Sequence, residues 1–286
     1  MDSDQLKAYY RKLLPLDVIF KCLGIDERRE VSFGTLSGSY IRFLSFASAD
    51  EFRKKLMSVV PERIDIGAVY NGRPAKHSCP RVVGKELVFD IDLTDYPRNC
   101  CEGKAVCEQC FVLVKAAIRI LDYSLRHEFG FCRIGFVFSG RRGVHCWVFD
   151  EAARMLSDAE RNEVVKYYDS VISSREYPEQ YARILRECAM HTESRGPSEA
   201  CMNDAEMFEK MYLRIDREVT QRRKHLIKMP FSVHPSTLAI SVPIDALNVD
   251  SMKLSEFPRL KDVLESPEVL EPYIAIAELW IERSDV

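Results

Sequence analysis

The alternation of apolar and polar residues along the chain predicts a mixture of helices and strands. Residues 5–23 and 49–60 carry apolar side chains at helical spacing, with a break at Pro15 in the first segment. Residues 31–46 alternate with period two on both sides of a Ser-Gly-Ser turn, which is typical of a β-hairpin, and residues 64–70 predict a further strand. The amino-terminal part is therefore expected to contain both classes of element.

The same mixture continues through the rest of the chain. Residues 151–213 are predicted to be mainly helical, with a polar interruption at 191–204. The expected strands are 86–93, 136–138, 144–149, 211–216 and 238–245. The expected helices are 111–128, 217–228 and 271–284.

Composition narrows the function classes. The chain has 286 residues, 47% of them hydrophobic and 30% charged, which are the proportions of an ordinary globular protein. A net charge of -3 excludes a globally basic nucleic-acid binder, so any such binding needs local patches. No apolar run approaches the ~20 residues of a membrane span, and the polar start is unlike a secretory or transit peptide. Ten cysteines in such a chain are therefore expected to be reduced thiols.

Two carboxylates in one short strand, at 86–93, are the strongest chemical signal. Strand side chains alternate with period two, so Val88, Asp90 and Asp92 share one face. Two like charges ~4 Å apart repel by roughly 4 kcal/mol at an effective dielectric of about 20. A hard divalent cation relieves that repulsion and accepts substrate phosphates as further ligands. The alternative is an edge strand with solvated carboxylates.

A third carboxylate, Asp216, ends the predicted strand 211–216. Three carboxylates from two strands can hold two metal ions, which activate an attacking hydroxyl and neutralise a leaving pyrophosphate. A strand-end aspartate is also a common helix N-cap, and that interpretation stays open. The acidic positions predict a metal-dependent phosphoryl-transfer site.

The sequence Ser-Gly-Arg-Arg-Gly-Val-His at 139–145 supplies the opposite charge. Gly140 and Gly143 allow a tight turn and close backbone approach. Arg141 and Arg142 are planar, bidentate donors suited to phosphate oxygens, and His145 adds a donor. Further along, Lys228 is expected where the helix 217–228 stops. The alternatives are a hairpin loop with solvated arginines and a solvated basic helix face.

Four cysteines lie within eleven residues at the start of the predicted helix 111–128. Cys107 and Cys110 have the Cys-x-x-Cys spacing of a zinc half-site, and Cys100 and Cys101 complete a possible tetrahedral set of four thiolates. Free thiols, or a redox pair at Cys107 and Cys110, are the alternatives; the spacing favours zinc over an iron–sulfur cluster.

Several of these motifs together resemble a known family. The segments VFDIDLTDYPRNCC, CEQC, FVFSGRRGVHCWVFDEAAR and PFSVHPSTLAISVPID, with IDIGAVYNGRP and YYRKLLP before them, resemble the catalytic small subunit of archaeal and eukaryotic DNA primase. The matches follow one another along roughly residues 9–250, and the long motifs resemble the eukaryotic branch more than the archaeal one. The resemblance therefore implies a nuclear protein in a reducing compartment.

The resemblance implies the archaeo-eukaryotic primase fold, an α/β (α+β) protein with a mixed β-sheet catalytic core. On this interpretation residues 1–286 form one catalytic domain, with a zinc-binding element at 96–112. Residues 151–210 form a helical subdomain that is shorter than in animal and fungal members. Residues 211–286 return to the core and end in a helix.

The resemblance also implies roles for individual residues. The two catalytic Mg²⁺ or Mn²⁺ ions are expected at Asp90, Asp92 and Asp216. The nucleotide is expected at Arg42, Asp65, Ser139, Arg141, Arg142, His145, Lys228 and His234. The structural Zn²⁺ is expected at Cys100, Cys101, Cys107 and Cys110.

The implied activity is synthesis of short RNA primers on single-stranded DNA from nucleoside triphosphates. The implied partners are a large iron–sulfur primase subunit, which forms a heterodimer with this chain, and the DNA polymerase α complex; no membrane is involved. A two-metal nuclease or phosphatase would use the same carboxylates but leaves the basic loop unexplained. A non-catalytic, zinc-stabilised replication scaffold leaves the aligned carboxylates unexplained.

Overall fold

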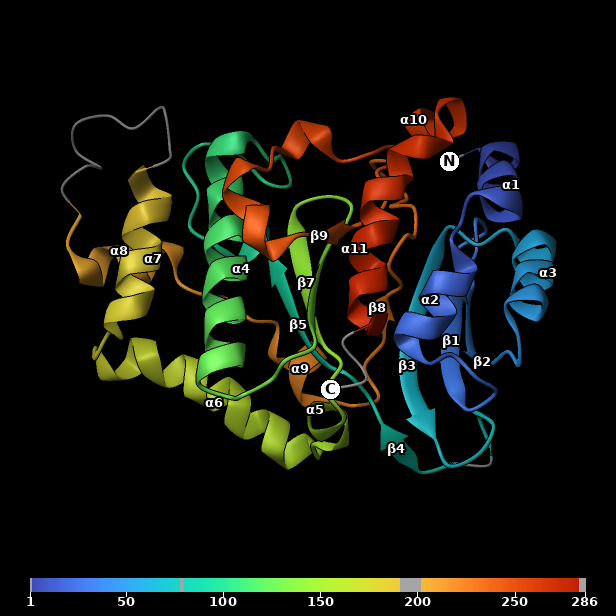
Figure 1. Ribbon diagram of the computed structural model, residues 1–286, viewed down its shortest axis with the longest axis horizontal. Helices are drawn as coiled ribbons and strands as arrows, with labels where there is room; N and C mark the ends of the chain where they lie inside the picture. The colour runs from blue at the N-terminus through green and yellow to red at the C-terminus, as the bar shows by residue number, and fades with distance from the viewer. Residues whose placement is uncertain (1, 78–79, 191–201, 283–286) are drawn as a thin grey trace.

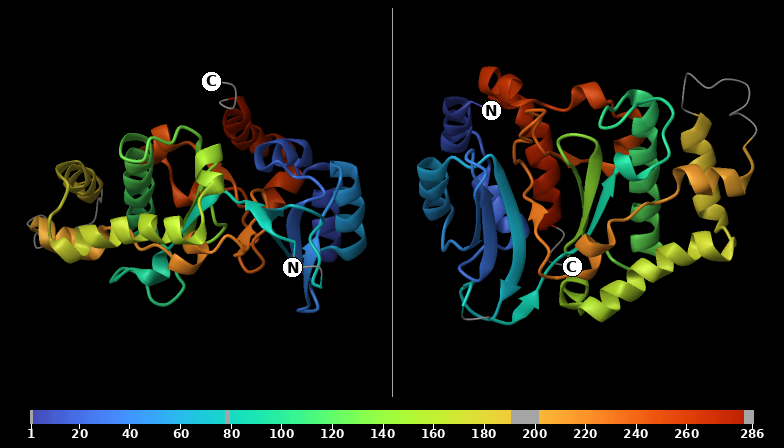
Figure 2. Two further views of the ribbon diagram at one scale, coloured as in Figure 1. Left: turned by 90° about the horizontal axis from the view of Figure 1, so that it is seen from below. Right: turned by 180° about the vertical axis from the view of Figure 1, so that it is seen from behind.

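Two antiparallel β-sheets and the helices around them make up the structure, a computed structural model that describes residues 2–77, 80–190 and 202–282 (Figure 1; Figure 2). The first sheet consists of β1 (Arg29–Gly34), β2 (Tyr40–Leu44), β3 (Arg63–Tyr70), β4 (Val82–Gly84) and β8 (Ile227–Lys228). The second sheet consists of β5 (Leu87–Asp92), β6 (Ile134–Phe138), β7 (Gly143–Val148) and β9 (Pro243–Ile244). The strand order is β2-β1-β3-β4, with β8 also paired to β3, and β5-β7-β6-β9. The predicted mixed α/β fold is confirmed.

The amino-terminal helices group around the first sheet (Figure 1). They are α1 (Ser3–Lys12), α2 (Leu16–Leu23) and α3 (Ala49–Val59). Pro15 lies between α1 and α2, since a proline inside a helix removes a backbone hydrogen bond. The predicted hairpin is confirmed by the antiparallel pairing of β1 with β2, in which Val31 lies opposite Leu44.

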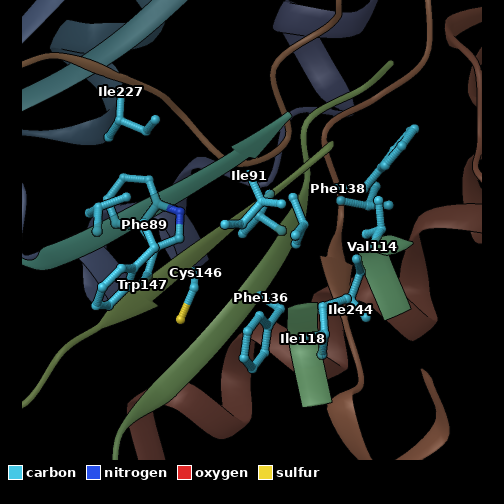
Figure 3. Close-up of a cluster of buried hydrophobic side chains, with 14 of the residues drawn as sticks. Phe89, Ile91, Val114, Ile118, Phe136, Phe138, Cys146, Trp147, Ile227 and Ile244 are labelled. Carbon is cyan, nitrogen blue, oxygen red and sulfur yellow. The ribbon is translucent and has the colours of Figure 1, made fainter. Parts of the chain in front are cut away.

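Helix α4 (Glu108–His127) packs against the second sheet and confirms the predicted amphipathic helix. The buried members of its predicted apolar face are Phe111, Val114, Ile118, Leu121 and Leu125. Figure 3 shows Val114 and Ile118 of α4 in the same cluster of side chains as Phe136 and Ile244 of the second sheet. Burial of such side chains contributes roughly 1.5–3 kcal/mol each, so this interface holds β5, β6 and β7 in place.

The predicted helical region is confirmed in the described residues. It contains α5 (Glu151–Met155), α6 (Asp158–Ser174), α7 (Glu179–Met190) and α8 (Asp204–Met211). Figure 1 shows α7 and α8 on the side of the molecule away from the first sheet, and α6 running from there toward α5. Most of the predicted polar interruption, 191–201, lies outside the described residues. The division of the chain into catalytic core and helical subdomain stays a prediction.

Three expectations for the carboxy-terminal part are corrected. Residues 211–216 are not a strand, because Met211 ends α8 and only Ile215 forms a bridge, to Ile91. The helix expected at 217–228 is the single turn α9 (Arg217–Gln221), because residues 227–228 pair with β3 instead. The strand expected at 238–245 is reduced to β9 and isolated bridges. Backbone pairing with strands distant in sequence outweighs the local pattern in all three segments.

The chain ends in η2 (Ala246–Ser251), η3 (Leu254–Glu256), α10 (Leu260–Glu265), η4 (Pro267–Leu270) and α11 (Glu271–Glu282), the last of which confirms the predicted terminal helix; η1 (Leu93–Asp95) follows β5. Among the described residues, one buried cluster includes both Leu6 of α1 and Trp280 of α11, so the two ends of the chain share a core. In the described part of the chain, no helix combines the length and apolarity that crossing a membrane requires.

A buried ion pair joins the two sheets. Arg29 of β1 donates to both carboxylate oxygens of Glu86, at 2.7 and 2.8 Å, directly before β5 begins. Neither side chain is more than 1% exposed. Burial opposes ionisation, but the Arg29 charge and hydrogen bonds outweigh it and lower the pKa of Glu86 to about 2. The pair fixes the first sheet against the start of the second.

Replacing Glu86 with glutamine is expected to lower the free energy of unfolding by about 3–5 kcal/mol at pH 7, because Arg29 is left charged and buried. Because the folded pKa of Glu86 lies below its usual 4.5, its contribution is complete above that value and is lost as pH falls toward 2. Denaturant unfolding across pH measures both effects. Glu163→Gln, which removes the exposed pair with Lys166, is the control and should change stability by less than about 1 kcal/mol; equal losses in the two variants would contradict the prediction.

Candidate active site

A cleft of about 310 Å³ lies between the two sheets and gathers most of the predicted site residues. β5 and β7 of the second sheet supply one wall, and β3 and β8 of the first sheet supply part of the other. The predicted residues that line the cleft are Asp90, Asp92, Ser139, Arg141, Arg142, His145, Asp216, Lys228 and His234. Carboxylates and cations that are far apart in the sequence therefore meet in one cavity.

The three carboxylates meet because one bridge fixes residues 215–216 against β5. The Asp216 amide donates to the Asp90 carbonyl oxygen at 3.0 Å, next to the bridge between Ile91 and Ile215. Asp216 is also the N-cap of α9, since one of its carboxylate oxygens accepts from the Glu218 amide at 3.0 Å. Asp216 can be both a helix N-cap and a predicted metal ligand, because the cap uses its Oδ1 atom and the residue still lines the cleft.

The electrostatics of Asp90 indicate a place for a cation. The pKa of Asp90 is raised to about 7, chiefly by burial and further by the negative charges of Asp92 and Asp216. The imidazole Nε2 of His145 lies 3.7 Å from its carboxylate. Burial, followed by the charges of Lys228 and Arg63, lowers the pKa of His145 to about 3, so this histidine is neutral and does not compensate the carboxylate. A divalent ion would keep Asp90 ionised.

Asp92 is held in a fixed orientation. Its Oδ1 accepts from Arg142 Nε at 2.6 Å and from the amide and hydroxyl of Thr94, each at 2.8 Å. Burial opposes ionisation here too, but these hydrogen bonds outweigh it and lower the pKa of Asp92. The carboxylate is therefore charged, and no hydrogen bond from the described residues occupies its second oxygen.

The loop between β6 and β7 depends on two glycines. Gly143 lies opposite Asp92 in the sheet, and a Cβ on it would lie 2.1 Å from the Ile91 carbonyl oxygen. Gly140 has φ +88°, and a Cβ there would lie 2.8 Å from the Cβ of His234. Only glycine permits these approaches, so the predicted requirement for glycine at both positions has a direct steric reason.

The cations of the cleft come from both sheets. Lys228 in β8 donates to the Ser139 carbonyl at 2.7 Å and thereby links β8 to the loop between β6 and β7. Burial is the main cause that lowers the pKa of Lys228 to about 8, so the amine remains mostly protonated at neutral pH. Burial and the charges of Lys228, Arg141 and Arg142 lower the pKa of His234 to about 3. The cavity is strongly positive at this end.

Two predicted nucleotide residues do not line the cleft. Asp65 is buried behind it in β3, accepts from the Tyr40 hydroxyl at 2.6 Å, and lies opposite Lys228 in the sheet. Arg42 on β2 pairs with Glu30 at 2.9 Å. Neither side chain is in the lining of the cleft, and the roles of both stay predictions. The negative charge of Asp65 raises the pKa of Lys228, although burial outweighs it.

Three charged or titratable residues of the lining were not predicted as site residues. Arg63 bonds to Asp65 at 2.7 Å and shares its strand face, so the period-two pattern of β3 could have identified it. Lys104 comes from the loop between the cysteine pairs, and His225 from the turn after α9. No sequence pattern marks Lys104, whereas His225 belongs to the basic run at 222–228. The conformation of the chain around each of them brings both to the cavity.

The four cysteines form a compact group beside the start of α4. The Sγ atoms of Cys100, Cys101, Cys107 and Cys110 all lie within 4.8 Å of one another, which suits a metal such as zinc. Burial opposes ionisation of Cys107, but hydrogen bonds from the Cys110 amide and the neighbouring thiols outweigh it and lower its pKa to about 7. A thiolate is the form that binds zinc.

Zinc content is expected to follow this group. The wild-type chain should retain about one zinc per chain through dialysis, and a Cys107→Ser/Cys110→Ser double variant should retain less than about a tenth of that, because two thiolates cannot close a structural site. Atomic absorption on the dialysed proteins measures this. Cys132→Ser, which removes an exposed thiol outside the group, is the control; equal zinc in both variants would contradict the assignment.

The chain resembles known proteins over most of its length. A family model described as DNA primase small subunit matches residues 89–246. The chain is 28% identical over 353 residues to the DNA primase small subunit of Schizosaccharomyces pombe, covering 93% of this chain and 78% of that protein. It is 29% identical over 247 residues to the DNA primase small subunit PriS of Pyrobaculum arsenaticum, covering 85% and 78%.

A solved structure shares the fold. The polymerase domain of Mycobacterium tuberculosis Ligase D in complex with DNA superposes with a TM-score of 0.50 at 12% sequence identity, covering 96% of this chain and 91% of that one. At this identity the likeness concerns the arrangement of the backbone.

Proposed function

Because the chain belongs to the DNA primase small-subunit family, we propose that it synthesises short RNA primers on single-stranded DNA from nucleoside triphosphates by two-metal nucleotidyl transfer. The observation that carries this proposal is the meeting of Asp90, Asp92 and Asp216 with a cluster of cations in one cleft between the sheets. Carboxylates at one end suit divalent ions, and cations at the other suit a polyphosphate.

The carboxylates fit divalent metal ions. Asp90 is destabilised as an anion by burial and by Asp92 and Asp216, and a cation removes that penalty. Two Mg²⁺ or Mn²⁺ ions at these residues would activate a primer 3′-hydroxyl and neutralise the leaving pyrophosphate. Arg142 and Thr94 keep Asp92 ionised and oriented before any ion binds. No side chain needs to act as general base.

The cationic end is proposed to bind the incoming triphosphate through Ser139, Arg141, Arg142, His145, Lys228 and His234. Neutral His145 and His234 donate or accept hydrogen bonds without adding charge, whereas Arg141, Arg142 and Lys228 compensate the phosphates. Stabilising charge that spreads over phosphate oxygens is the main contribution to phosphoryl transfer. Asp65 is proposed to orient Lys228, and Arg42 to act at the periphery of the nucleotide pocket.

The remaining features are proposed to support this activity. Zinc at the four cysteines has a structural role, residues 1–286 act as one catalytic domain, and residues 151–210 form a reduced helical subdomain. With a net charge of -3, the chain binds template weakly on its own. A large iron–sulfur subunit, together with the DNA polymerase α complex in the nucleus, is proposed to strengthen binding of the template.

One assay tests the proposal. The wild-type chain is incubated with single-stranded DNA, ribonucleoside triphosphates and Mg²⁺ or Mn²⁺, with and without a large primase subunit. We expect short RNA products that require both template and metal. Absence of RNA under all these conditions overturns the proposal; degradation of the DNA instead identifies a two-metal nuclease.

A further inference from the structure

A second pocket of about 280 Å³ adjoins the cationic end of the catalytic cleft. Lys104 and Arg141 line both cavities, whereas Asp90, Asp92 and Asp216 line only the first. The new lining residues include Arg259, Thr237, Phe138 and Phe257. The second pocket therefore lies beyond the arginine that faces the proposed triphosphate site, on the side away from the carboxylates.

We propose that this pocket is a phosphate subsite that receives inorganic pyrophosphate as it leaves the catalytic cleft, an inference that rests on the proposed function. Lys104, Arg141 and Arg259 are its ligands. No covalent bond changes in the subsite: the bond between the α- and β-phosphates has already broken in the cleft, and the leaving group moves past Arg141.

The charge of the pocket supports an anionic ligand. Its lining contains three cations and no carboxylate. Within the described ranges, the side chains of Lys104, Arg141 and Arg259 have neither an ion pair nor a hydrogen bond, whereas Arg142 is bonded to Asp92 and Arg63 to Asp65. The adjacent carboxylate of Asp262 accepts from the backbone amide of Arg259, not from its guanidinium.

Like charges that converge without a partner repel one another, and the repulsion is relieved when an anion binds between them. Two planar guanidinium groups and one ammonium supply enough donors for several phosphate oxygens. A single phosphate would satisfy fewer of them than a pyrophosphate. The charge and the donor number both favour a polyphosphate over a carboxylate or a neutral ligand.

The frame of the pocket is rigid. The Thr237 hydroxyl donates to the Gly140 carbonyl at 2.6 Å, and the His234 amide donates to the Ala239 carbonyl at 2.8 Å, so the loop that carries Arg141 is fastened to the neighbouring segment. The floor is formed by Phe138 and Phe257, whose rings stack at 3.9 Å. Fixed walls place Arg141 between the two cavities without a conformational change.

Lys104 connects the subsite with the cysteine group. It lies between Cys101 and Cys107, and the carbonyl oxygens of its neighbours Gly103 and Ala105 both accept from Arg98 at 2.7 Å. The loop that the cysteines close therefore carries a cation to the boundary of both cavities.

The test is calorimetric titration of inorganic pyrophosphate into the full chain at about 0.15 M salt, where exposed charges are screened beyond ~8 Å. Arg259→Gln is compared with Lys261→Gln, which removes the same charge two residues away, from an exposed side chain that does not line the pocket. We expect the pyrophosphate dissociation constant to rise about tenfold in Arg259→Gln, through loss of a charge-assisted contact, and less than about twofold in Lys261→Gln. Both side chains are exposed, so thermal unfolding should be unchanged.

A parallel titration with a non-hydrolysable nucleoside triphosphate separates two sources of phosphate. Unchanged triphosphate affinity in Arg259→Gln supports a subsite for free pyrophosphate. If Arg259→Gln lowers the affinity for both ligands equally, the terminal phosphates of the bound triphosphate already reach Arg259. The pocket is then part of the triphosphate site, and the proposed role in pyrophosphate exit is overturned. Pyrophosphate affinity that is unchanged in Arg259→Gln, or equally reduced in Lys261→Gln, overturns the subsite. These titrations measure binding and need no primer synthesis, so failure of the subsite proposal can be distinguished from failure of the proposed activity.

Discussion

Asp92→Asn should reduce RNA synthesis by at least about a thousandfold, while the chain remains folded. Asparagine keeps the size of the side chain and an acceptor for Thr94 and Arg142, but it removes the negative charge that a catalytic cation requires. Interactions that stabilise charge in the transition state typically account for about 10²–10³ in rate per group, and a metal ligand lies at the upper end of that range. Primer synthesis under saturating nucleotide, with Mg²⁺ or Mn²⁺, measures the loss.

The matched control for this substitution is Asp95→Asn. Asp95 ends the short helix η1 after β5, and its pKa is raised by burial and by Asp92 and Asp216, but it does not line the cleft. Asp95 is therefore close enough to Asp92 and Asp216 to interact with their charges, but it lies outside the lining of the cleft that is proposed to bind the substrate. We expect its activity to stay within about threefold of wild type. If Asp92→Asn kept more than a tenth of wild-type activity, or if both variants lost activity equally, Asp92 would have no direct role in the chemistry.

The parts of the fold that the sequence predicted correctly are those whose pattern is set by burial on one face. β5 and α4 are examples, because their period-two and helical spacings each match a side that packs into the core. The same spacing placed Asp90 and Asp92 on one strand face. Their common face could therefore be derived before any tertiary contact was known.

The segment 211–228 could not be predicted in the same way. Apolar residues of 211–216 alternate like a strand, yet Met211 is buried as the last residue of α8. Residues 217–228 have helix-forming composition, yet the helix ends at Gln221 and residues 227–228 pair with Ile66 and Asp65. These choices depend on partners more than 100 residues away, which a local pattern does not contain.

The same limit of prediction from a local pattern applies to the candidate site. Asp216 was identified by its residue type, but its approach to Asp90 depends on the bridge between Ile91 and Ile215. Lys104 was missed because the conformation of its loop brings it to the cleft. Residue chemistry can be inferred from the sequence, whereas the set of side chains that shares a cavity is decided by tertiary pairing.

Gly143→Ala is the second change with a large expected effect, and it tests the steric argument at the centre of the site. A Cβ at this position would lie 2.1 Å from the Ile91 carbonyl oxygen and 3.3 Å from the Asp92 Cα, so β7 must move away from β5. Such a shift would lengthen the 2.6 Å contact between Arg142 Nε and Asp92 Oδ1. Misplacement by about 1 Å can lower an enzymatic rate about 10²-fold, and crowding in a packed region costs about 1–3 kcal/mol of stability.

Gly84→Ala provides the matched control, since Gly84 also lies in a strand and an added Cβ there meets nothing within 4 Å. We expect Gly143→Ala to lower both primer synthesis and the midpoint of denaturant unfolding, and Gly84→Ala to leave activity unchanged and stability equal or slightly higher, because alanine restricts the unfolded chain. Assays are run at a temperature where circular dichroism shows both variants folded, so that lost activity reports geometry. The same behaviour in the two variants would mean that β7 tolerates a side chain at Gly143, and the close approach of the strands would then not be what aligns Arg142 with Asp92.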